Sequence, residues 1–328
     1  MRAAFLGPAG TNSHEALLAA GLDAEYVGFA TVAAVVGAVQ DGSVDRALVP
    51  IENSREGGVG ATLDALVFDA PDVLIVGELV HRVSYCLAAA EPIAPDEVRT
   101  VHSHPQATGQ CARFLAEQLP AAVVVSAAST ADAVRAVAEG GALAGAAPHA
   151  AIGTRHAARL YGATVLAVGI EDEAENATRF AWIARAPVAA TPSPPDTVPS
   201  PPGTMSQPPA TAAPPPPGTT TPPRPGTAAP PPPGTAASSP PAVKTALVFW
   251  GGGDLAPGWL VDCLTEFSSR AINLTRIESR PRRVGLGHYM FFCDLEGAAS
   301  NPDVAAAIAR LRSHCEAVRV LGSFPASR

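Results

Sequence analysis

A long proline-rich segment is the sequence feature that most restricts how this chain can fold. Residues 187–242 consist almost wholly of Pro, Ala, Thr, Ser and Gly, and Asp196 and Arg224 are their only charged residues. The nonapeptide TAAPPPPGT occurs twice unchanged, at 211–219 and 227–235. This composition cannot supply the apolar face that a helix or strand buries, so we predict a disordered, partly polyproline-II tether. The alternative role for the segment is docking to a proline-reading domain.

The tether splits the 328-residue chain into residues 1–186 and 243–328, and the chain is long enough for two or three domains with hydrophobic cores of their own.

The net charge of −8 and the near absence of lysine argue against a nucleic-acid or anionic-membrane partner. Five cysteines without CxxC or Cys/His spacing indicate reduced thiols and no metal site. The N-terminus lacks a signal-peptide pattern, and no apolar run approaches the ~18–20 residues of a membrane span, so we expect a cytoplasmic protein.

Residues 1–186 alternate short apolar runs with helical patterns, which is typical of a parallel α/β sheet. Strands are expected at 2–7, 24–29 and 46–51, and a helix begins near Ser13. Thr31 is suited to cap the next helix.

Residues 243–328 follow a βαββαβ pattern. Two strands at 274–281 and 287–297 form an expected hairpin, and Asn301 with Pro302 predicts the start of the last helix. About 85 residues in this order fit a ferredoxin-like sandwich.

Two polar segments in the first part follow predicted strands. GPAGTNSHEA (7–16) opens a helix, whose free backbone N–H groups and dipole favour an anion; the alternative is an ordinary strand–helix turn. VPIENSREGGVG (49–60) places Asn53 and Ser54 at the end of an apolar strand, where open α/β sheets bind ligands. A cap or turn role for Asn53 and Ser54 is the alternative.

Two further segments could face the same ligand. VHSHPQATGQC (101–111) carries two histidines, but no third ligand is spaced to bind a metal with them, so a turn and helix cap is favoured. EDEAENATRFAWIAR (171–185) places Thr178 and Arg179 at the start of an apolar strand. An arginine is costly to bury there unless an anion meets it. Together these segments predict an anion-binding cleft between two α/β lobes.

In this order, GPAGTNSHEA, VPIENSREGGV, HSHPQATGQC and NATRF resemble the motifs of prephenate dehydratases. INLTRIESRP (272–281) resembles the phenylalanine-responsive ACT domain that follows the catalytic part in that family. The resemblance covers nearly all of the chain except the tether. It implies an α/β fold, with a two-lobed catalytic domain like periplasmic binding proteins at 1–186, a linker at 187–242 and a ferredoxin-like ACT domain at 243–328.

The resemblance also implies an activity and its partners. The expected enzyme converts prephenate to phenylpyruvate, carbon dioxide and water in phenylalanine biosynthesis, with no cofactor and no metal. L-phenylalanine is the implied effector, and a homodimer or homotetramer is the implied assembly. Arogenate dehydratase and a non-catalytic amino-acid sensor on the same fold are the alternatives.

Site residues carry over by matching the motifs. Thr178 is the implied catalytic residue, a hydrogen-bond or proton donor to the departing hydroxyl. The implied substrate-binding residues are Arg179, Phe180, Asn53, Ser54 and Thr11, and the implied effector-binding residues are Glu278, Ser279, Arg280, Pro281 and Leu260.

Three features depart from the family pattern. Asn12 stands where an aromatic residue is common, and Trp259 follows Gly258 where the family usually has Pro-Gly-Ala-Leu. Trp259 lies near the expected effector pocket, so a shifted effector preference is an open alternative. The tether is also longer than the family's usual connection, which argues against tight coupling between effector and active site.

Overall fold

The architecture is that of a computed structural model, in which residues 1–140, 148–186, 242–253 and 256–327 are described. The predicted tether, 187–242, lies outside the described residues apart from Ala242. Within those described ranges, no helix is long and apolar enough to cross a membrane.

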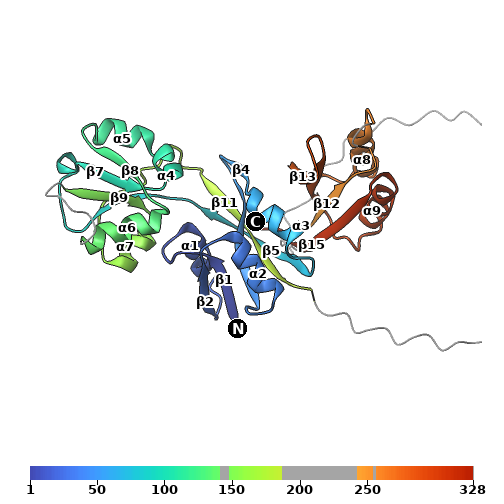
Figure 1. Ribbon diagram of the computed structural model, residues 1–328, viewed down its shortest axis with the longest axis horizontal. Coiled ribbons are helices and arrows are strands. Elements are labelled where there is room, and N and C mark those ends of the chain that lie inside the picture. Colours follow the sequence, from blue (N-terminus) through green and yellow to red (C-terminus); the bar gives the residue numbers. More distant parts are fainter. Residues whose placement is uncertain (141–147, 187–241, 254–255, 328) are drawn as a thin grey trace, which may run out of the picture. The chain divides into compact units, whose positions relative to one another are not determined.

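One mixed sheet of the N-terminal part (residues 1–186) has, among the described residues, six strands in the order β2-β1-β3-β11-β5, with β4 paired to β3. Its strands are β1 (Arg2–Leu6), β2 (Glu25–Phe29), β3 (Arg46–Asn53), β4 (Gly57–Gly58), β5 (Val73–Arg82) and β11 (Ala177–Arg185). Its helices are α1 (Asn12–Ala19), α2 (Val32–Gln40) and α3 (Gly60–Phe68) (Figure 1). Thr31 caps α2 as predicted, because its side chain accepts a hydrogen bond from Ala34 N at 3.1 Å.

A second sheet of the N-terminal part has the order β10-β6-β9-β7-β8 across the described residues. Its strands are β6 (Cys86–Ala89), β7 (Thr100–Ser103), β8 (Val123–Ser126), β9 (His149–Gly153) and β10 (Thr164–Val168). It carries the short 3-10 helix η1 (Pro95–Glu97) and the helices α4 (Pro105–Gln110), α5 (Ala112–Gln118), α6 (Thr130–Glu139) and α7 (Arg155–Tyr161). The helical segment after β7 is divided into α4 and α5 at Cys111, whose φ of −119° and ψ of 22° leave the helical region.

Neither sheet of the N-terminal part is wholly parallel, which corrects the expectation from the alternating pattern. β1 pairs in parallel with β2 and β3, as a βα repeat requires. β11 comes back from the second sheet and enters the first in the opposite direction, so it pairs antiparallel with both β3 and β5. This returning strand brings Thr178 beside the end of β3.

The C-terminal part (residues 243–328) has the predicted βαββαβ order. Its elements are β12 (Val243–Trp250), α8 (Trp259–Ser268), β13 (Leu274–Pro281), β14 (Tyr289–Glu296), α9 (Pro302–His314) and β15 (Ala317–Pro325). The strands pair antiparallel in the order β13-β14-β12-β15. Asn301 caps α9 as predicted, because its Oδ1 accepts a hydrogen bond from Asp303 N at 2.9 Å.

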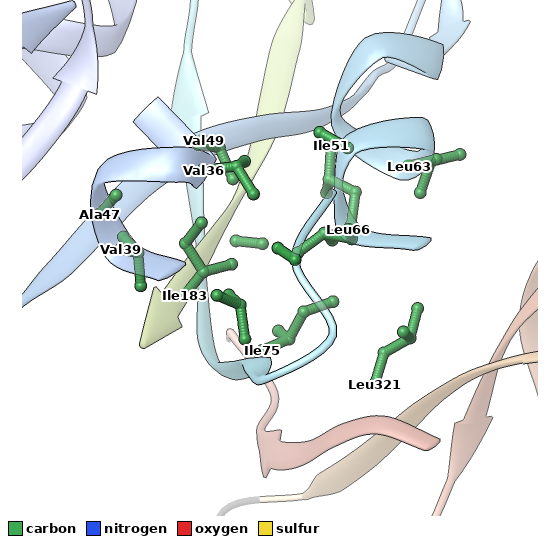
Figure 2. Packing of buried hydrophobic residues seen from close by; sticks show 14 of the residues in the cluster. Val36, Val39, Ala47, Val49, Ile51, Leu63, Leu66, Ile75, Ile183 and Leu321 are labelled. Carbon is green, nitrogen blue, oxygen red and sulfur yellow. The ribbon is translucent and has the colours of Figure 1, made fainter. Parts of the chain in front are cut away.

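One hydrophobic cluster joins the two parts. Leu321 of β15 and Phe292 of β14 belong to the same buried cluster as Leu66 of α3 and Ile75 of β5. In Figure 2, Leu321 lies at the edge of this cluster, and Ile75 and Leu66 are among the labelled side chains on the side that it faces. Fully burying one such side chain contributes about 1.5–3 kcal/mol. The face of the C-terminal sheet that bears these residues therefore packs on the N-terminal part, and α8 and α9 cover the other face.

Candidate active site

A pocket of about 500 Å³ is lined by residues from both sheets of the N-terminal part. The first sheet supplies the β1–α1 loop, the end of β3, the β4–α3 loop and β11, while the second supplies α4 and the start of α6. The lining includes Thr11, Asn53, Gln110, Thr178 and Phe180. Strand ends and loops that lie far apart in the sequence thus meet around one cavity, where open α/β sheets commonly bind ligands.

Thr178 and Asn53 form the polar centre of this pocket. They are register partners on β11 and β3, and Asn53 Nδ2 donates a hydrogen bond to Thr178 Oγ1 at 3.0 Å. Both residues are buried, with 9% and 8% of their surface exposed. Because the hydroxyl oxygen accepts from an amide, the hydroxyl hydrogen is left to donate to a ligand.

Asn53 also has the turn role that the sequence left open. Its Oδ1 accepts hydrogen bonds from Arg55 N at 3.0 Å and Glu56 N at 3.2 Å. These bonds hold the turn that leads to Gly57, whose φ of +79° suits a glycine. One side chain therefore fixes the loop and orients the threonine hydroxyl.

A chain of amides extends from Asn53 to the second sheet. Asn53 Nδ2 lies 3.2 Å from Asn176 Oδ1, and Asn176 Nδ2 donates to Gln110 Oε1 at 2.7 Å. Gln110 ends α4, so the chain bridges the two walls of the pocket. Asn176 and Gln110 were not predicted from the sequence as site residues. Asn176 precedes Thr178 by two residues, and the strand period of two would have placed it on the same face.

Helix N-termini are the groups of the pocket best suited to hold an anion. α1, α3 and α6 begin beside it at Thr11, Val59 and Ser129, all of which line the cavity. The side chain of Val59, at the N-cap of α3, makes no capping hydrogen bond. The first backbone N–H groups of α3 therefore have no side-chain acceptor at the N-cap. None of the described lining residues is a lysine or an arginine. An anion in this pocket would thus be held by helix dipoles and N–H groups.

Two residues expected to bind substrate do not line the pocket. Ser54 is exposed, and its Oγ accepts a hydrogen bond from Ala177 N at 3.0 Å, so it fastens β11 instead. Arg179 follows Thr178 on the strand, and successive strand side chains point to opposite faces. Its guanidinium therefore lies on the far side of β11, where protein carboxylates, not a ligand, meet its charge. Thr11 lines the pocket, but its side chain caps α1 and donates to Leu6 O at 3.0 Å.

Arg179 is bound by carboxylates from three strands in the described structure. Its nitrogens lie 2.9 Å from Glu52 Oε2, 3.0 Å from Glu78 Oε2 and 2.5 Å from Asp294 Oδ2. Burial works against the charged form of Arg179, but its carboxylate partners outweigh burial and raise the pKa of the guanidinium. Burial would likewise raise the pKa of Glu78, yet hydrogen bonds, first from Lys244, leave that pKa below its usual range.

His14 and His156 tie α1 to α7 next to the pocket. His14 Nδ1 accepts a hydrogen bond from Gly10 N at 3.1 Å and lies 3.2 Å from His156 Nε2. Burial, and then the neighbouring His156, lowers the pKa of His14. The neutral imidazole is therefore the form that fits this contact.

Of the five residues expected to bind an effector, one lines a pocket of the C-terminal part and the other four do not line that pocket. Leu260 lines a second pocket of about 270 Å³, together with Trp259, whose Nε1 donates to His314 O at 2.8 Å. Glu278, Ser279, Arg280 and Pro281 of β13 are absent from its lining. Arg280 pairs instead with Asp64 of α3 at 2.9 Å, Glu278 pairs with Arg276 at 2.6 Å, and Ser279 and Pro281 are exposed.

Comparison with known families and curated proteins gives consistent matches. The family model described as prephenate dehydratase matches residues 3–188. A prephenate dehydratase of Mycolicibacterium vanbaalenii is 36% identical over 337 residues, which are 98% of this chain and 90% of the relative. One from Mycobacterium sp. (strain JLS) is 38% identical over 336 residues, which are 99% and 89% of the two chains.

Solved structures with the same fold include enzymes of that description. A prephenate dehydratase from Arthrobacter aurescens in complex with L-Phe is 32% identical, with a TM-score of 0.74 over 99% of this chain and 90% of that one. A structure described as GqqA, a novel type of quorum quenching acylase, is 26% identical, with a TM-score of 0.74 over 100% and 98% of the two chains. A prephenate dehydratase from Staphylococcus aureus, 23% identical with a TM-score of 0.69 over 99% and 100%, shares the fold.

Proposed function

The chain belongs to the prephenate dehydratase family, and from that premise we propose that it converts prephenate to phenylpyruvate, carbon dioxide and water in phenylalanine biosynthesis. The observation that carries the proposal is the Thr178 hydroxyl. Its oxygen accepts from Asn53 within the pocket, so its hydrogen is available to a substrate oxygen.

The reaction requires a hydroxyl and a carboxylate to leave the same ring. The ring carboxylate departs as carbon dioxide, its bonding electrons enter the ring, and the C4 hydroxyl leaves as water as the ring becomes aromatic. Thr178 donates a hydrogen bond, or a proton, to this oxygen as it becomes basic in the transition state. The departing hydroxide takes up one proton to become water, and solvent supplies that proton directly or by reprotonating Thr178. No redox change occurs, so the step balances without a cofactor.

Binding of the dianionic substrate follows from the same pocket. With no lysine or arginine among the described lining residues, the N-termini of α1, α3 and α6 are the groups suited to its carboxylates. This replaces the expected role of Arg179. Phe180 supplies an apolar wall beside Thr178 for the ring.

Three other activities are weighed against this one. Arogenate carries an amino group where prephenate has the keto group of its side chain, so comparing the two substrates tests that alternative directly. A non-catalytic sensor has no need of a hydroxyl donor such as Thr178. An acylase needs a nucleophile activated by a base, whereas Thr178 Oγ1 accepts from the Asn53 amide, which cannot act as a base.

We further propose that residues 243–328 form an ACT domain that binds an aromatic amino acid, with residues 1–186 as a two-lobed catalytic domain and 187–242 as the linker. The βαββαβ order supports this assignment, as does the likeness to a structure solved with L-Phe. The pocket beside Trp259 and Leu260 is the candidate effector site.

The function is tested by incubating the purified chain with prephenate and, separately, with arogenate, and measuring phenylpyruvate and phenylalanine. Thr178→Ala is expected to lower kcat by about 100-fold or more with little change in KM, because one transition-state donor is lost. Thr178→Ser keeps the hydroxyl and should stay within about 10-fold of wild type. A wild-type chain that binds amino acids but turns over neither substrate would refute the proposal.

A further inference from the structure

The face of β11 opposite the pocket carries an ionic cluster, defined here as Arg179 with Glu52, Glu78 and Asp294, in which the Glu52 side chain is 38% exposed and the others are buried. The side chains of Arg179, Glu78 and Asp294 are 12%, 2% and 3% exposed. Charged groups buried to this extent require partners at hydrogen-bonding distance, and each has them. Asp294 is the member contributed by the C-terminal part, from β14.

The ionic cluster lies at an irregular point of the sheet. Thr178 pairs with Asn53 and Arg179 with Glu52, but Phe180 pairs with Pro50, so the register of β11 and β3 shifts between Arg179 and Phe180. Such a bulge changes the direction in which nearby side chains point. The Arg179–Glu52 pair therefore holds β11 against β3 directly beside the bulge. The local direction of β11 at this point sets the orientation of the Thr178 side chain toward the pocket.

Asp294 is itself held on the C-terminal sheet. It is the register partner of Arg276 on β13, and Arg276 Nη1 lies 3.9 Å from Asp294 Oδ2. Glu278 of the same strand bonds Arg276 at 2.6 Å, and its carboxylate occupies the space that a Cβ at Gly58 would need. Gly58 lines the pocket, so β13 and β14 support both the pocket wall and the back of β11.

We propose that Asp294 is a positioning residue for Thr178, acting through Arg179 on the bulged segment of β11 and β3. The inference rests on the function proposed above. It makes turnover depend on a side chain of the C-terminal part that does not touch the substrate. A cluster that only clamps the two parts together would affect stability and leave the kcat of the folded protein unchanged.

The test compares Asp294→Asn with Glu296→Gln in the full-length chain, using phenylpyruvate formation and thermal unfolding. Asparagine keeps the shape of Asp294 and removes its charge. We expect kcat to fall on the order of 10-fold with KM within about 2-fold, because Thr178 is misdirected while the pocket remains. Glu296 is exposed and lies two residues further on the same strand face, so Glu296→Gln should keep wild-type kcat.

A double-mutant cycle of Asp294→Asn and Arg179→Lys compares the kcat losses of the two single variants with that of the double variant. It shows whether the two residues act through one mechanism or independently. If Asp294 acts through Arg179, the double variant should lose little more than either single variant, whereas independent effects would multiply. Multiplied losses, or wild-type kcat in Asp294→Asn, overturn the inference. If Asp294→Asn does not fold, Arg179→Lys alone decides, and wild-type kcat in that variant overturns it. A wild-type chain without dehydratase activity refutes the proposed function instead.

Discussion

Replacing Gly322 with alanine should weaken the contact between the C-terminal sheet and the N-terminal part. Gly322 lies on β15 with a φ of +149°, and an added Cβ would overlap the carbonyl oxygen of Ile75 on β5. The same Cβ would lie 2.9 Å from Ile75 C and 3.1 Å from Ile75 N. These are backbone atoms, so no side chain can rotate away and the two strands must move apart.

The size of the loss follows from two terms. Overpacking costs about 1–3 kcal/mol, and holding a residue with a Cβ at this φ costs about 1–3 kcal/mol more. A central value of about 4 kcal/mol lowers Tm by roughly 8–16 °C, at about 2–4 °C per kcal/mol for a chain part of this size. Thermal unfolding followed by circular dichroism measures it.

A matched control isolates the strand contact. Gly162 also has a positive φ, +74°, but an added Cβ there meets nothing within 4 Å. Gly162→Ala should therefore show only the backbone strain, about 1 kcal/mol. A Tm for Gly322→Ala no lower than that of Gly162→Ala would refute the contact as the cause.

Two further predictions concern the effector and the pH. L-phenylalanine titrated into the assay should change the rate of phenylpyruvate formation. Leu260→Ala alters the pocket beside Trp259 and should weaken that response. A wild-type rate that L-phenylalanine does not alter would rule it out as the effector. Burial, and then His156, lowers the pKa of His14 in the folded chain below its ordinary value of 6.5. The unfolded chain therefore binds more protons than the folded chain in this range, so the free energy of unfolding falls as the pH drops below about 6.5. Urea unfolding at pH 7.5 and about 5.5 measures this loss, His14→Gln should reduce it, and an equal loss in both proteins would contradict the assignment.

The sequence predicted the pocket better than the direction of its side chains. Asn53 and Thr178 were expected from their motifs, and the structure brings them within hydrogen-bonding distance. Arg179 was expected to face a ligand because a buried arginine needs an anion. That physical argument holds, but its anions are protein carboxylates, one of them 115 residues away on β14. Local sequence patterns carry no information about a partner so distant. The alternation of side chains along a strand does, however, predict that Arg179 and Thr178 point to opposite faces of β11.

The relation between the two parts was also beyond local patterns. A long tether suggested weakly coupled domains, whereas Leu321 and Phe292 share a core with Ile75. Each of the βαββαβ elements could be predicted because each follows from its own periodicity and caps. The open face of the C-terminal sheet needs a surface to cover it, and the sequence does not say which surface that is.

β11 separates two kinds of bonding along one strand. On the pocket side, Asn176 with Gln110 and Asn53 forms neutral amide bonds between the walls, so widening the pocket breaks contacts that neither salt nor ordinary pH changes weaken. On the other side, Arg179 is held by full charges. In the proposed active site, the wall that would admit substrate is thus held by uncharged hydrogen bonds, while the strand that carries the Thr178 hydroxyl is held on its opposite face by ion pairs.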